Sequence, residues 1–88
     1  MKKLTSLEEM SRLEDREIQA VLRELEMDDL VVALKGASPA VLDAVYRNMS
    51  QRAGTVARER GEEMGPVPLD KVEAAHKLIL EAAARVLR

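Results

Sequence analysis

The sequence predicts an all-α fold, a compact bundle of six short helices in a single domain over residues 1–88. Three observations predict it. Apolar residues recur at helical spacing along most of the chain, and no segment sustains the period-two alternation of a strand. Of the 88 residues, 47% are apolar and one is aromatic, so the core is aliphatic, as suits helices packed on helices. A chain of this length is also too short for two independent cores.

The first two helices are predicted from their starts. Ser6 and Glu9 have the spacing of a capping box, which opens a short helix. Asp15 is expected to cap the second helix, because apolar residues then recur at i, i+3, i+4 and i+7 from Ile18 to Leu25.

Helix-breaking and helix-capping residues delimit the next two helices. The third begins at Met27 or Asp28 and is closed by Gly36, since glycine tolerates the left-handed conformation at a helix end. Ser38 and Pro39 open the fourth helix, where the serine caps and the proline occupies the first turn.

The fifth helix is predicted to run from Ser50 to about Met64 and to be the most exposed of the six. Its apolar face is thin and carries Gly54 and Gly61. The segment Gly65–Pro68 then breaks the helix, because its two prolines exclude continuation. The last and longest helix is expected to start at Asp70 with Glu73 three residues on, and to bury a face carrying Val72, His76, Ile79, Ala83 and Val86.

Composition excludes several function classes. Fourteen basic and sixteen acidic residues give a net charge of −2, which does not favour a nucleic-acid-binding module. There is no cysteine for a disulfide or thiolate site, no motif of a known active site and a single histidine, His76, expected to be a packing residue. No apolar stretch is long enough for a membrane helix, and the N-terminus lacks a secretory signal. We therefore expect a cytoplasmic protein that is not an enzyme, has no cofactor or metal, and does not insert in a membrane.

The charges on the fifth helix have two interpretations. They can simply form a solvated face held by intrahelical pairs, Arg58 with Glu62 and Arg60 with Glu63. Alternatively, the helix is a contact surface. The two glycines favour close approach by another helix, because each makes the helix thinner at a cost of up to about 1 kcal/mol relative to alanine.

Several motifs resemble one family. The runs DREIQAVLRELEMDDLVVALKGAS, NMSQRA and MGPVPLDKVEAAHKLI occur in the order and at the separations seen in the C-terminal domain of the flagellar motor switch protein FliG. The resemblance covers about residues 7–82 and implies a compact six-helix domain of the rotor, at the cytoplasmic face of the inner membrane. It also implies that charged side chains contact the cytoplasmic loop of the stator protein MotA, in torque generation and switching.

The resemblance also implies which residues make this contact. Lys35 and Arg52 keep the family's basic residues and would face stator acids, while Glu59 keeps an acidic residue and would face a stator base. Arg60 reverses the charge of the family's second acid. Glu62 and Glu63 would supply the displaced acidity one turn later.

Other departures leave an alternative open. Ala44 stands where the family usually has a lysine, and Pro68 replaces an arginine. The family's upstream parts, which join the rotor proteins FliM and FliF, have no counterpart in these residues, so the chain is either part of a longer rotor protein or a stand-alone relative. In the second case it would be a protein–protein interaction module without the torque role, using an apolar groove or self-association. Its candidate surface residues are Met10, Met27, Met49 and Met64.

Overall fold

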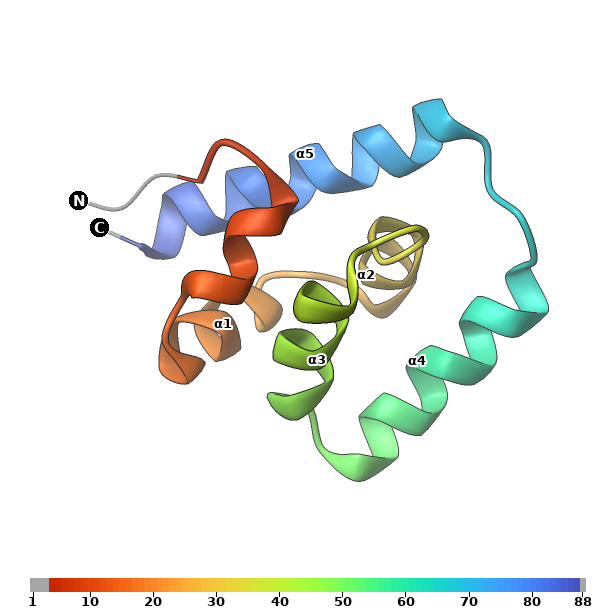
Figure 1. Cartoon of the computed structure of the whole chain (residues 1–88), viewed down its shortest axis with the longest axis horizontal. Coiled ribbons are helices and arrows are strands. Elements are labelled where there is room, and N and C mark those ends of the chain that lie inside the picture. The colour runs from red at the N-terminus through yellow and green to blue at the C-terminus, as the bar shows by residue number, and fades with distance from the viewer. Residues whose placement is uncertain (1–3, 88) are drawn as a thin grey trace.

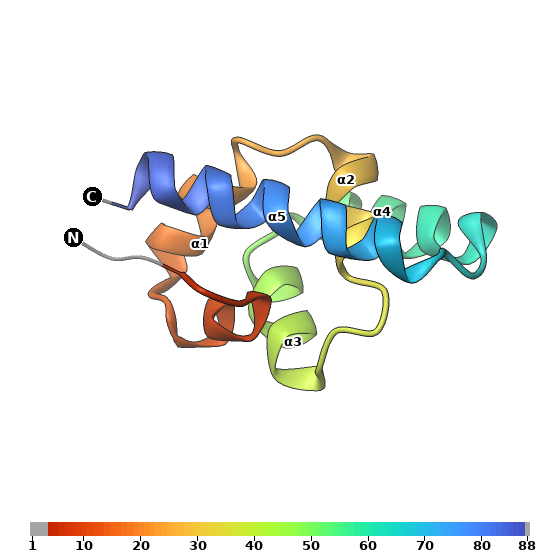
Figure 2. The same cartoon turned by 90° about the horizontal axis from the view of Figure 1, so that it is seen from above.

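The computed structural model describes residues 4–87, and these form helices and no strand. The predicted all-α bundle of six helices is confirmed. In chain order the elements are the 3₁₀ helix η1 (Leu7–Arg12), α1 (Asp15–Leu22), α2 (Met27–Ala33), α3 (Pro39–Arg47), α4 (Gln51–Met64) and α5 (Leu69–Val86). Helix α5 runs along one side of the molecule, and α2 lies between α5 and α4 (Figures 1 and 2).

The main hydrophobic core joins every element except α4. It is built from aliphatic side chains of η1, α1, α2, α3 and α5, with Met10, Ile18 and Ile79 among its largest fully buried members. The prediction of Met10 as a candidate surface residue is therefore wrong, because its side chain is buried in the core. No residue of α4 belongs to this core within residues 4–87, so α4 is attached to the bundle from outside.

Two predicted helix starts are each off by one residue. Helix α1 begins at Asp15 with Glu14 as its cap, because the carboxylate of Asp15 is engaged elsewhere, by the side chains of Arg47 and Asn48. Helix α5 begins at Leu69 instead of Asp70, because the carbonyl of Pro68 already accepts the first helical hydrogen bonds.

The predicted short helix after Ser6 is confirmed and is a 3₁₀ helix, in which the Glu9 carboxylate accepts from the N–H of Ser6 as the capping box predicts. The end of the third helix needs correction. Helix α2 ends at Ala33, three residues before Gly36. The chain then turns and reaches Gly36 with a positive φ of 74°, the conformation expected of a glycine there.

The single histidine links two helices. The Nε2 atom of His76, on α5, lies 2.8 Å from the carbonyl oxygen of Ala33 at the end of α2, to which it donates a hydrogen bond. The ring is half-buried, and this contact agrees with the predicted packing role. Within residues 4–87, no helix combines the length and hydropathy needed to cross a membrane.

Candidate functional site

Helix α4 has the bounds that the sequence predicts. The hydroxyl of Ser50 accepts a hydrogen bond from the N–H of Ala53 at 3.0 Å and caps the helix start. At the other end Gly65 adopts φ 66° and ψ −159°, a conformation that essentially only glycine takes. The non-helical segment Gly65–Pro68 then leads to α5, so the bounds of α4 are set by the residues at its two ends (Figure 1).

The inner face of α4 meets α2 through small residues. Only Gly54 and Ala57 of this helix are buried, and Gly61 lies against Val31 of α2. A Cβ atom added at Gly61 would stand 3.7 Å from Val31 Cγ1, which is ordinary van der Waals contact. The sequence predicts that another helix approaches the glycines closely, and within the domain α2 approaches α4 at Gly61.

Polar contacts brace α4 beside this crossing. The guanidinium of Arg60 forms an ion pair of 2.8 Å with Asp28 in the first turn of α2. From the turn that follows α2, the Nζ atom of Lys35 donates to the carbonyl oxygen of Gly61 at 2.6 Å. That carbonyl lies in the last turn of α4, where helical carbonyls lose their intrahelical partners. Lys35 is thus a C-terminal cap of α4 supplied by another part of the chain.

The predicted intrahelical ion pairs do not form. Arg60 pairs with Asp28 instead of Glu63, and the guanidinium of Arg58 lies 4.4 Å from the centre of the Tyr46 ring on α3 instead of reaching Glu62. A cation over an aromatic ring is attracted to its face. Sequence reasoning did not find these contacts, because Asp28 lies 32 residues from Arg60 and no local spacing signals the pair.

The outer face of α4 carries three of the six predicted site residues. We define the outer stripe as Arg52, Val56, Glu59 and Glu63, which share one face by their spacing of i, i+4, i+7 and i+11. This face is opposite to the one that meets α2. The three charged members are exposed and form no ion pair with another residue of the range 4–87. Val56, Glu59 and Glu63 also line a shallow depression together with Arg60.

The other predicted residues are placed differently. Lys35 lies two residues after the end of α2, away from Arg52, and Arg60 is neutralised by Asp28. Glu62 is exposed and lines a hollow on the opposite flank of α4. Ala44 is 2% exposed and belongs to the core, so it is not a lost member of a charged surface.

Comparison with known proteins identifies close relatives. The model of the FliG C-terminal domain family matches residues 1–88. The flagellar motor switch protein FliG of Thermotoga maritima is 43% identical over 79 residues, covering 90% of this chain and 24% of the relative. That of Pseudomonas aeruginosa is 46% identical over 77 residues, covering 88% and 23%. The relatives carry the name of a motor switch protein and not of an enzyme, in agreement with the sequence-based prediction.

Solved structures show the same fold. FliG of H. pylori (residues 86–343) superposes with a TM-score of 0.90 at 26% identity, covering 94% of this chain and 39% of that one. Full-length FliG of Aquifex aeolicus gives a TM-score of 0.88 at 28% identity, covering 93% and 26%. The chain thus spans about a quarter of the length of the two curated relatives.

Proposed function

The chain belongs to the FliG C-terminal domain family, and we propose that it serves as a flagellar rotor and switch domain that contacts the stator protein MotA. The contact surface is the outer stripe of α4. The observation that supports this proposal is the exposure of Arg52, Glu59 and Glu63 on one face, each without an ion pair inside residues 4–87. Charges that have no partner within the domain are available to a partner outside it.

In this proposal, the six predicted residues divide between two roles. Arg52 faces stator acids, and Glu59 with Glu63 faces stator bases. Lys35 and Arg60 act indirectly, because their contacts with Gly61 and Asp28 hold α4 against α2 and so position the outer stripe. Glu62 extends the acidic surface toward the flank of α4.

The energetics suit a contact that forms and breaks repeatedly. Exposed ion pairs contribute on the order of 0–1 kcal/mol each, so a few of them give weak and brief binding. A rotor surface that passes successive stator positions requires such release. The domain would work at the cytoplasmic face of the inner membrane, in the flagellar basal body. Contacts with the rotor proteins FliM and FliF would use other parts of a longer protein, since the relatives are about four times as long as this match.

Calorimetric titration with a fragment of the cognate MotA cytoplasmic loop tests the proposal. We expect binding at low salt that weakens steeply toward 1 M, where the Debye length falls to about 3 Å. Arg52→Glu should abolish it, because the reversal places like charges together. Lys71→Glu is the matched control, since Lys71 is an exposed cation on α5. No binding at low salt, or equal binding by the Arg52→Glu variant, would contradict the proposal.

One observation favours the alternative function, a stand-alone interaction module. Met27 and Met49 line an apolar groove of about 410 Å³ with Leu22, Leu25 and Leu30, where α1, α2, the turn after α3 and the start of α4 meet. Methionine-lined grooves adapt to apolar partners. Under this alternative the groove binds a second copy of the chain. Sedimentation equilibrium distinguishes the two functions, because a stable dimer that ignores salt supports the module and a monomer contradicts it.

A further inference from the structure

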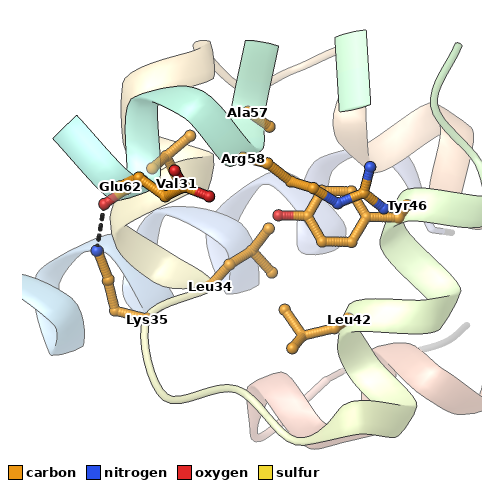
Figure 3. Close-up of a pocket in the computed structure, with 9 residues that line it drawn as sticks. Val31, Leu34, Lys35, Leu42, Tyr46, Ala57, Arg58 and Glu62 are labelled. Carbon is orange, nitrogen blue, oxygen red and sulfur yellow. Dashed lines mark hydrogen bonds between the residues drawn. The ribbon is translucent and has the colours of Figure 1, made fainter. Parts of the chain in front are cut away.

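A hollow on the flank of α4 has the features of a binding site that the outer stripe does not use (Figure 3). It has a volume of about 320 Å³ and lies between α2, α3 and α4. Buried and half-buried apolar groups form its wall, and charged side chains stand at its mouth. The apolar lining comes from Val31, Leu34, Leu42, Ala57 and the Tyr46 ring, and the charged lining from Lys35, Arg58 and Glu62.

The hydroxyl of Tyr46 points into this hollow (Figure 3). It makes no hydrogen bond with another residue of the described range, 4–87. No buried side-chain polar atom of the described residues lacks a hydrogen-bond partner, so this unpaired hydroxyl is accessible from outside. Tyr46 therefore offers one polar group to an occupant inside an otherwise apolar wall.

The mouth of the hollow has an excess of positive charge. Arg58 has no ion pair within residues 4–87, and its guanidinium remains beside the Tyr46 ring with its N–H donors available. Lys35 uses one of its three N–H donors on Gly61 and keeps two. Against these two cations stands one carboxylate, Glu62. An occupant that carries a carboxylate complements this arrangement.

We propose that the hollow binds an apolar side chain of the partner loop together with the carboxylate of an adjacent residue of that loop. The apolar side chain packs on Leu34 and Leu42, and the carboxylate accepts hydrogen bonds from the Tyr46 hydroxyl and the Arg58 guanidinium. The inference rests on the proposed function, because the occupant belongs to the same charged partner that contacts the outer stripe.

Continuity between the two surfaces favours this occupant over an unrelated ligand. By helical spacing, Arg58 and Glu62 lie on the edge of α4 between the outer stripe and the face that meets α2. A segment that lies on the outer stripe therefore reaches the hollow by crossing this edge. The apolar contact adds a component of binding that salt does not screen.

Titration of the same MotA loop fragment against Tyr46→Phe and Arg58→Met tests the inference. Tyr46→Phe removes only the hydroxyl, and Arg58→Met keeps an apolar stem over the ring. We expect each variant to bind about five-fold more weakly, the effect of losing one hydrogen bond. Methyl resonances of Leu34 and Leu42 should shift on binding in the wild type. The melting temperature of Tyr46→Phe should stay unchanged, because its hydroxyl has no partner within the described residues.

The outcomes separate this inference from the proposed function. Weaker binding by both variants, with shifts at Leu34 and Leu42, supports the hollow. Wild-type affinity in both variants, with binding still lost in Arg52→Glu, overturns the hollow and leaves the outer stripe as the contact. Shifts confined to the groove around Met27 and Met49 also overturn it. No binding by the wild-type domain overturns both proposals.

Discussion

The Nζ atom of Lys35 lies 2.6 Å from the carbonyl oxygen of Gly61, so a residue just after α2 caps the last turn of α4. The N–H of Gly65 would bond this carbonyl in a continuing helix, but it bonds the carbonyl of Glu62 instead. Lys35 therefore satisfies an acceptor that the end of α4 exposes, and its positive charge complements the negative end of the helix dipole.

Replacing Lys35 by methionine should destabilise the domain by about 1 kcal/mol, because the hydrogen bond is lost while the apolar stem is kept. Urea denaturation measures the change in the free energy of unfolding. Lys77→Met is the matched control, since Lys77 is exposed on α5. An equal effect of the two substitutions would contradict the capping role.

Gly61→Ala should stabilise the domain by up to about 1 kcal/mol. Alanine is the better helix former, and its Cβ would meet Val31 at an ordinary contact distance.

Gly65→Ala should instead destabilise the domain by about 1–3 kcal/mol, because φ 66° with ψ −159° is strained for any side chain. Thermal unfolding measures the melting temperature, which we expect to rise in Gly61→Ala and to fall in Gly65→Ala. A loss of stability in Gly61→Ala would mean that α2 and α4 need the glycine to approach.

The ion pair of Arg60 with Asp28 should be worth no more than about 1 kcal/mol, because both side chains are more than half exposed. Arg60→Glu places two carboxylates together and should destabilise the domain. The double variant Arg60→Glu with Asp28→Lys should recover the loss by reversing the pair. Additive effects in this double-mutant cycle would show that the two residues are not coupled.

Acid should weaken the contact between α1 and α3. Hydrogen bonds from Asn48 and Arg47 hold the pKa of Asp15 below its ordinary value of 3.8. Because the pKa is lower in the folded state, this stabilisation is complete above about pH 3.8 and disappears as the pH falls through the folded-state pKa. Unfolding free energies measured across this range should depend less on pH in Asp15→Asn than in the wild type. Asp70→Asn, which changes an exposed carboxylate on α5, is the control, and an equal flattening there would contradict the assignment.

Features that depend on neighbours in sequence were predictable. Ser38 and Ser50 cap α3 and α4 as expected, because each hydroxyl bonds an N–H three residues on. The bounds of α4 follow from this cap and from the Gly65–Pro68 break. The all-aliphatic core and the exposure of α4 follow from composition and periodicity.

Features that depend on residues far apart in the sequence were not predictable. Asp15 is not the cap of α1, because its partners are the last residue of α3 and the residue that follows it, 32 and 33 residues away. The position of Lys35 opposite Gly61 depends on how α2 crosses α4. Because helix packing cannot be read from local spacing, the sequence did not distinguish the outer stripe from Lys35 and Arg60, which hold α4 against α2. It also did not place Ala44 in the core.

Chemical-shift mapping tests the outer stripe most directly. The domain would be labelled with nitrogen-15 and titrated with the MotA loop fragment at low and high salt, with Arg52→Glu in parallel. We expect the largest amide shifts within residues 50–64, around Arg52, Glu59 and Glu63, lost at high salt and in the variant. Absent shifts, or salt-insensitive shifts confined to other helices, would contradict a charged contact surface on α4.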